Sequence, residues 1–152
     1  MSELISASHV FTDCPATCID EVLGFFSQKA VELGCADSVS AVFDAFRARE
    51  AQGTTGMAGG FAIPHAKSPA VKELVVLAAK FSGQIEWPSM DDAPIKFAIA
   101  LLVPSDQAGT TYLQLLSKIA VMLMDSFARE ELLAENDPAK LAELIDAGIN
   151  KG

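Results

Sequence analysis

Apolar residues recur at helical spacing in two segments of the first third of the chain. The first pattern predicts a helix over residues 19–33, followed by Gly34, which readily adopts the left-handed backbone that closes helices. The second predicts a helix over residues 39–50, with Ser38 or Asp37 placed to cap its first turn. The buried faces should be formed by Ile19, Val22, Leu23, Phe26, Ala30 and Leu33 in the first helix, and by Val39, Val42, Phe43 and Phe46 in the second.

The middle of the chain carries strand patterns separated by loops. Four glycines within residues 51–60 predict a loop, which we call the glycine loop. Residues 61–63 resemble a short strand that Pro64 ends, because proline has no N–H to donate. Residues 74–81 and 95–103 are apolar and rich in branched side chains, which is typical of strands buried on both faces.

Helical patterns return in the last third of the chain. Thr110 or Thr111 should open a long helix to about Asp125, and a last helix should cover residues 138–147 with Gly148 closing it. The inward residues of the long helix should be Leu113, Leu116, Ile119, Ala120 and Leu123. With no repeat or linker, the chain is predicted to be a single domain over residues 1–152. We expect an α/β sandwich in which helices flank a central mixed β-sheet.

The charge of the chain is strongly acidic but unevenly spread. The formal net charge of −9 argues against nucleic acid as a partner, because phosphate backbones need a basic surface. Residues 47–72 reverse the sign, since this segment holds four basic residues and Glu50 as its one acidic residue. We call its cations the basic island: Arg47, Arg49, Lys67 and Lys72. Such a reversal inside an acidic chain favours binding of an anion.

The composition also predicts where the protein works. A chain of 152 residues with 51% hydrophobic content can bury a core without disulfides or metals. No apolar run is long enough to span a bilayer, and the first ten residues lack the pattern of a secretory signal. Cys14, Cys18 and Cys35 make an odd count that suits a reducing compartment. The four-residue spacing of the first two suits one helical face and a structural role. We therefore expect a cytoplasmic protein without metal or cofactor.

The two histidines differ in their surroundings. His9 lies far from glycine and basic residues, and we expect it to be a solvent-exposed or capping side chain. His65 follows Pro64 at a predicted strand end, next to the glycine loop and within the basic island. A neutral imidazole can attack phosphorus at neutral pH because its ordinary pKa is about 6.5. Arg49, Lys67 and the amides of the glycine loop would then be donors for the phosphoryl oxygens.

Several motifs around His65 are similar to a known family. The run ARE (48–50), followed by TTGMAGGFAIPHAK (54–67), resembles the signature of the fructose/mannitol type of enzyme IIA of the sugar phosphotransferase system. The similarity continues through SMDDAPIKFAIALLVPSDQ (89–107) and LQLLSKIAVMLMD (113–125). It is strong over residues 40–127, and the fructose-specific type is the most similar.

This resemblance implies a function for the chain as a phosphotransferase component. The family accepts a phosphoryl group from the phosphorylated histidine-containing carrier protein and transfers it to a cysteine of enzyme IIB, which phosphorylates the incoming sugar. His65 matches the phosphorylated histidine, and Arg49 matches an arginine that should pair with phosphate. The alternative for Arg49 is a helix-end cation that interacts with the helix dipole. Contact with the membrane would come only through the sugar permease complex.

Two further residues near the motif have open alternatives. Thr55 fits the threonine of the family and could bond phosphate or the imidazole ring, or it could be an ordinary turn hydroxyl. Glu50 could orient Arg49 or lie solvated at the helix end.

Tyr112 departs from the pattern of the family, which has a second histidine at the start of the long helix. Tyrosine can donate a hydrogen bond to phosphate but takes no positive charge near neutral pH. It could equally be a half-buried aromatic packed beside Leu116 and Ile119. The substitution therefore leaves open a regulatory alternative, in which the chain is a phosphorylation-dependent binding module like the nitrogen-related branch of the family.

Other candidate sites are weak. The glycine loop lacks the Gly-Lys-Ser/Thr ending of a nucleotide loop, so ATP binding is not expected. Asp91 and Asp92 lie in turn-forming sequence without further metal ligands nearby, and we expect a turn. Met122 and Met124 are best explained as helix packing.

Overall fold

The computed structural model describes residues 5–107 and 110–150. Its strands are β1 (Val10–Cys14), β2 (Phe61–Ala62), β3 (His65–Ser68), β4 (Val75–Ile85) and β5 (Ile95–Pro104). Its α-helices are α1 (Ile19–Glu32), α2 (Val39–Gln52), α3 (Thr110–Met124), α4 (Ser126–Ala134) and α5 (Pro138–Asn150). Two short 3-10 helices, η1 (Ala7–His9) and η2 (Ser105–Gln107), precede β1 and follow β5.

The strands form one mixed sheet in the order β1-β4-β5-β2, with β3 also paired to β5. β4 and β5 are antiparallel, whereas β1 runs parallel to β4 and both β2 and β3 run parallel to β5. Consequently β2 and β3 are two successive pieces of one edge, with Ile63 and Pro64 between them. This edge carries the candidate site.

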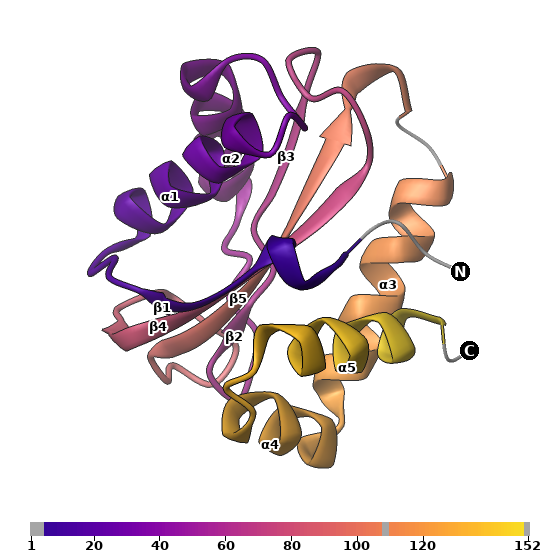
Figure 1. The fold of residues 1–152 in the computed structure, drawn as a ribbon. Coiled ribbons are helices and arrows are strands. Elements are labelled where there is room, and N and C mark those ends of the chain that lie inside the picture. Colours follow the sequence, from indigo (N-terminus) through magenta and orange to yellow (C-terminus); the bar gives the residue numbers. More distant parts are fainter. Residues whose placement is uncertain (1–4, 108–109, 151–152) are drawn as a thin grey trace.

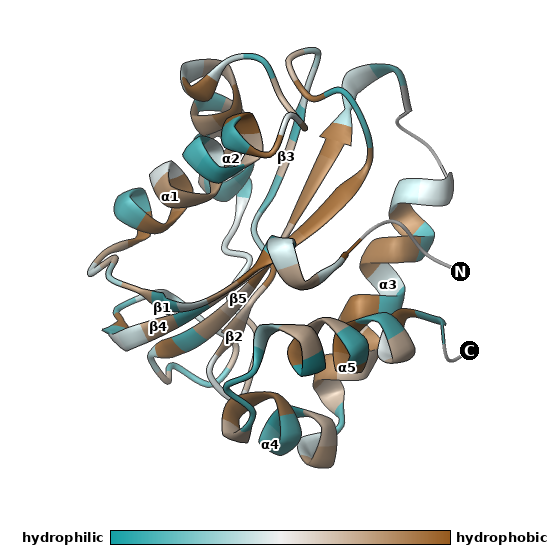
Figure 2. Ribbon diagram, in the orientation of Figure 1, coloured by the Kyte–Doolittle hydropathy of each residue, from teal (hydrophilic) through white to brown (hydrophobic). Residues whose placement is uncertain are grey.

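Helices cover both faces of the sheet (Figure 1). α1 and α2 pack on one face around a core that includes Phe26, Phe46 and Leu77. α3, α4 and α5 pack on the other face around Phe97, Ile119 and Ile145. Figure 2 shows that β4 and β5 between these layers are largely hydrophobic, as expected for strands buried on both faces. The predicted α/β sandwich with a central mixed sheet is confirmed.

Local signals explain the start of α2 and the end of α1. Ser38 caps α2 by accepting a hydrogen bond from the Ala41 amide at 3.2 Å. Gly34 follows α1 with φ of 79°, the left-handed conformation that glycine favours. Both features agree with the sequence-based prediction for these two helices.

Several predicted details were wrong, and each has a physical reason. Gly148 does not close α5, which continues to Asn150; a Cβ at this glycine would overlap Met122 of α3, so the glycine permits close packing of two helices. In α3, Leu113 is 55% exposed while Leu115 is buried, so the predicted apolar face is rotated at its start. Met124 is 74% exposed and does not pack in the core. Cys14 ends β1 and Cys18 precedes α1, so the two do not share a helical face.

No helix within residues 5–107 and 110–150 has the length and apolar character needed to cross a membrane.

Candidate functional site

His65 lies where the edge of the sheet resumes after an interruption. Pro64 has no N–H, but its carbonyl accepts a hydrogen bond from the Leu101 amide at 2.9 Å, so the chain stays on β5. His65 then pairs with Leu101 as the first residue of β3. The prediction that Pro64 ends the strand was therefore incomplete, because the strand continues beyond it. The histidine is 7% exposed.

The imidazole ring of His65 is held at both nitrogens. Nδ1 lies 2.7 Å from the carbonyl oxygen of Ile63, and Nε2 lies 3.0 Å from Nε of Arg49. A carbonyl only accepts and a guanidinium only donates, so the proton must be on Nδ1 and the lone pair on Nε2. Nε2 is therefore the nucleophilic atom of this ring.

The surroundings also keep this ring neutral. Burial lowers the pKa of His65 below its ordinary value, and the positive charge of Arg49 lowers it further. The Ile63 carbonyl and the charge of Glu50 act in the opposite direction without reversing the shift. The folded protein therefore holds the neutral ring, with Nε2 unprotonated, at neutral pH, and this is the form that can attack an electrophile.

Arg49 reaches His65 from the last turn of α2. Its Nη1 donates to the carbonyl of Gly53 at 2.8 Å, just beyond the end of the helix. The side chain thus serves a helix-end carbonyl and the histidine at the same time. Both sequence-based interpretations of Arg49 agree with this geometry, and its guanidinium is the cation that faces Nε2.

Glu50 organises the glycine loop. Its carboxylate accepts from the Thr55 amide at 2.8 Å, the Thr55 hydroxyl at 2.7 Å and the Thr54 hydroxyl at 3.2 Å. It also accepts from the indole nitrogen of Trp87 at 2.9 Å. No hydrogen bond joins Glu50 to Arg49, so neither predicted role of Glu50 describes these contacts. The carboxylate instead ties the end of α2 to the loop and to the chain after β4.

Replacing Glu50 by alanine should destabilise the fold by about 2–4 kcal/mol, because it leaves several donors without their charged acceptor. Urea unfolding followed by the fluorescence of Trp87, the single tryptophan of the chain, measures this change. Glu32→Ala is the matched control, because Glu32 also lies in the last turn of a helix but makes one exposed ion pair, with Lys29 at 3.3 Å. An equal, small loss of stability in both variants would contradict the role given to Glu50.

Thr55 is buried, and its hydroxyl donates to Glu50. The proton of this hydroxyl is therefore already used within the loop. Five amides of the loop also donate to acceptors within the protein and away from His65. They belong to Gly53, Thr55, Gly56, Met57 and Gly59. In this arrangement these five amides hold the loop in shape, contrary to the expectation that they would bind phosphoryl oxygens.

Tyr112 lies in the first turn of α3, with its ring centroid 6.1 Å from that of His65. The side chain is half-buried against the core that α3 covers. Both sequence-based interpretations of Tyr112 therefore fit its position, since it packs on the core and flanks the histidine.

The basic island does not gather as one cluster. Arg47 pairs with Asp20 at 3.3 Å and stacks over Phe43, away from His65. Lys67 is exposed on β3, two residues beyond His65 and on the same face of that strand. Arg49 is thus the cation of the island that contacts the histidine.

The other residues considered as candidate sites, His9 and Asp91, form hydrogen bonds with groups other than His65. His9 is partly buried, and its Nδ1 lies 3.2 Å from the Val76 carbonyl, so the expectation of a solvent-exposed or capping residue was wrong. Asp91 accepts from the amides of Gly59 and Ala93, which confirms a turn. In the described part of the chain, no three His, Cys, Asp or Glu side chains are grouped closely enough to hold a metal ion.

Comparison with known proteins identifies the class of fold. The solved structure of nitrogen regulatory protein IIA-Ntr from Neisseria meningitidis matches with a TM-score of 0.87 and 25% identity, over 94% of this chain and 97% of that one. A complex of enzyme IIAMTL with phosphorylated enzyme IIBMTL from Escherichia coli matches with a TM-score of 0.76 and 17% identity, over 94% of this chain and 97% of that chain. The fold is that of the IIA proteins.

The sequence narrows this class to one family. The family model described as phosphoenolpyruvate-dependent sugar phosphotransferase system, EIIA 2, matches residues 3–148. A PTS system fructose-specific EIIA component from Haloferax volcanii is 37% identical over 131 residues, which cover 86% of this chain and 84% of that protein. The chain belongs to the EIIA 2 family.

Proposed function

We propose that the chain is a phosphohistidine carrier of the phosphoenolpyruvate-dependent sugar phosphotransferase system. It accepts a phosphoryl group on His65 from the phosphorylated histidine-containing carrier protein and transfers it to a cysteine of enzyme IIB during fructose-type sugar uptake. The observation that carries this proposal is the pair formed by the unprotonated Nε2 of His65 and Nε of Arg49, 3.0 Å apart. The fructose-specific relative supports the choice of sugar class.

The transfer step needs no proton movement at the reacting atom. The lone pair of Nε2 attacks phosphorus while the bond between phosphorus and the donor histidine breaks, and that donor nitrogen keeps the electron pair. The proton on Nδ1 stays in its hydrogen bond to the Ile63 carbonyl, which supports the positive charge that the phosphorylated ring acquires. Arg49 then bonds the phosphoryl oxygens in place of Nε2.

Tyr112 joins this site in our proposal as a support for the phosphoryl group, through its hydroxyl at the first turn of α3. Thr55 and Glu50 support it indirectly, because their hydrogen bonds fix the loop that follows Arg49. No cofactor or metal takes part. We propose that residues 1–152 act as a single cytoplasmic unit that meets the membrane only through the sugar permease complex.

A regulatory role is the second candidate, and a specific observation favours it. The nitrogen regulatory protein of Neisseria meningitidis shares this fold at 25% identity, and Tyr112 replaces the second histidine expected for a sugar carrier. In this alternative His65 is still phosphorylated, but the output is a change in binding to another protein.

Transfer to enzyme IIB separates the two candidates. When the phosphorylated chain is incubated with a fructose-type enzyme IIB, most of the label should be transferred to that enzyme IIB. Sugar phosphate should form when the permease is added. A matched incubation with an enzyme IIB whose cysteine is replaced by serine should leave the label on the chain. Labelled chain that retains its label with every enzyme IIB offered would favour the regulatory role and exclude the transport role.

A further inference from the structure

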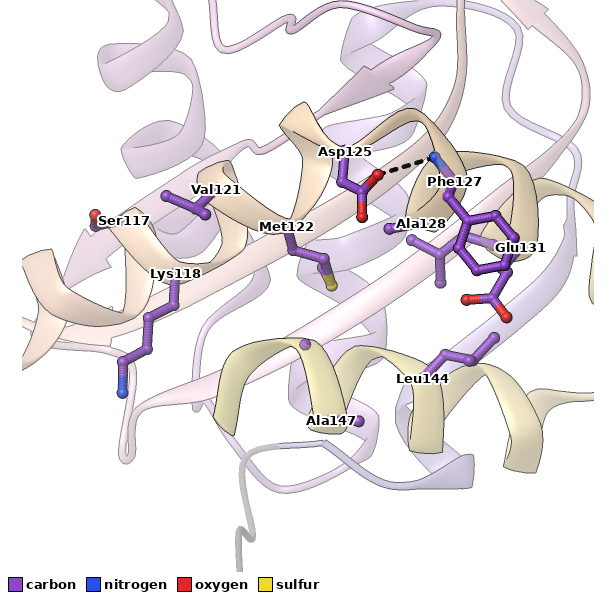
Figure 3. A pocket seen from close by; sticks show the side chains of 12 residues that line it. Ser117, Lys118, Val121, Met122, Asp125, Phe127, Ala128, Glu131, Leu144 and Ala147 are labelled. Atoms are coloured by element: carbon purple, nitrogen blue, oxygen red, sulfur yellow. Dashed lines mark hydrogen bonds between the residues drawn. The ribbon is translucent and has the colours of Figure 1, made fainter. Parts of the chain in front are cut away.

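A groove with apolar walls lies between α3, α4 and α5, on the face of the sheet opposite α1 and α2 (Figure 3). It has a volume of about 610 Å³. Met122 points from α3 into it, and Leu144 and Ala147 line it from α5. The groove is separate from the site around His65, because Arg49, His65 and Tyr112 are not among its lining residues.

The rim of the groove exposes large apolar side chains. Phe127, at the start of α4, is 66% exposed, and Val121, on α3, is 63% exposed. An exposed aromatic ring beside an apolar groove is unfavourable in water and is typical of a surface that another molecule covers. One surface therefore offers both a projecting ring and a groove that can receive one.

The charges on this surface are arranged to complement themselves. Lys118 lies on α3, and Asp125 lies seven residues further along the chain, directly after α3, where it caps α4. Both line the groove, Lys118 towards one end and Asp125 towards the other (Figure 3). Within the described residues Lys118 makes no hydrogen bond or ion pair, and one carboxylate oxygen of Asp125 accepts from the Phe127 amide.

We propose that a second copy of this chain docks in the groove with two-fold symmetry, the two α3 helices running antiparallel. An axis that passes between Val121 and Met122 places Lys118 of each copy opposite Asp125 of the other, which forms two ion pairs. The same axis brings Phe127 of each copy towards the end of the other groove where Ser117 and Lys118 lie.

The proposed contact does not include the site around His65, because Arg49, His65 and Tyr112 are not among the residues that line the groove. Ser117, where the contact ends on α3, follows Tyr112 by five residues, a distance of about 7.5 Å along the helix. The dimer therefore presents two such sites, one on each copy, beside the shared surface.

Sedimentation equilibrium of the full chain tests this proposal. The wild-type chain should sediment with twice its 16.1 kDa mass at concentrations of about 100 μM and above. Val121→Glu should return it to the mass of one chain, because it sets two like charges against each other near the axis. Met90→Glu is the matched control, since Met90 is 73% exposed on a loop outside the groove, and it should remain a dimer. Circular dichroism checks that each variant is folded.

A charge exchange tests the register of the two helices. Lys118→Glu and Asp125→Lys should each weaken the dimer about tenfold or more, because each sets like charges opposite one another. A mixture of the two variants should form a heterodimer, in which both pairs again join opposite charges. A wild-type chain that stays monomeric at about 1 mM, a dimer unchanged by Val121→Glu, or a mixture without heterodimer would overturn the proposal. A monomer that binds an amphipathic peptide helix in this groove would overturn it too.

Discussion

We expect His65→Ala to accept no phosphoryl group from the phosphorylated histidine-containing carrier protein, whereas the wild-type chain becomes labelled under the same conditions. Phosphoenolpyruvate, enzyme I and the carrier protein supply the label, and the acid-labile, base-stable product is counted on gels. The loss should be complete, because no other side chain in the site offers an unprotonated nitrogen held against a cation. This is the largest effect that the structure predicts.

The second histidine of the chain supplies the matched control for this experiment. His9→Ala should be labelled like the wild-type chain, because His9 lies on η1 and contacts the Val76 carbonyl instead of the basic island. His65→Gln keeps a polar side chain of similar length and guards against a loss caused by misfolding. Label remaining on His65→Ala at the wild-type level would remove His65 from the proposed function, and loss of label from His9→Ala would point to a second acceptor.

Much of the fold follows from local patterns in the sequence. α1 and α2 were predicted because their apolar spacing, the Ser38 cap and Gly34 all act within a few residues of one another. β4 and β5 were predicted because continuous branched residues suit strands buried on both faces. The site histidine was found for a similar reason, since Pro64, the glycine loop and the basic residues are neighbours in sequence.

The features that were missed depend on contacts between distant segments. β1 is only five residues long and carries Asp13, a residue type that is rare in strands, so its strand character depends on pairing with β4, more than sixty residues away. β3 exists because β5 supplies a partner after Pro64. α4, a helix of nine residues that follows α3 directly, was not predicted, and it packs on the core that it shares with α3 and α5. Neither pairing nor packing of this kind is visible in a local pattern.

The candidate site also combines features that follow from the local sequence with features that depend on distant segments. Arg49 and His65 were recognised from their motif, but the role of Glu50 depends on Trp87, which lies thirty-seven residues further along the chain. The amides of the glycine loop were expected to face the phosphoryl group because glycines often do so in phosphate loops. Here Glu50 and Asp91 engage two of them, so the position of those carboxylates decides where the amides point.

Arg49→Ala should slow phosphoryl acceptance by about 10²–10³-fold while the protein stays folded. In the resting site the guanidinium occupies the lone pair of Nε2, so it must rotate off this atom as phosphorus arrives. It then donates to the phosphoryl oxygens, where negative charge is concentrated during transfer. Without Arg49, no guanidinium occupies the lone pair of Nε2. The negative charge of the phosphoryl group, however, then has no cation beside it in a largely buried site. Because the second effect is larger, the rate falls, and single-turnover labelling measures the change.

A neighbouring residue on the same helix makes this test specific. Arg47→Ala removes the same charge from α2, but Arg47 pairs with Asp20 away from the site, so acceptance should change less than about twofold. Arg49→Lys should recover only part of the rate, because an ammonium lacks the planar fork of the guanidinium. A second measurement comes from NMR titration, in which Arg49→Ala should raise the pKa of His65, since the charge of Arg49 lowers it in the wild-type protein. Equal rates for Arg49→Ala and Arg47→Ala would show that the contact at 3.0 Å holds the histidine in place and takes no part in transfer.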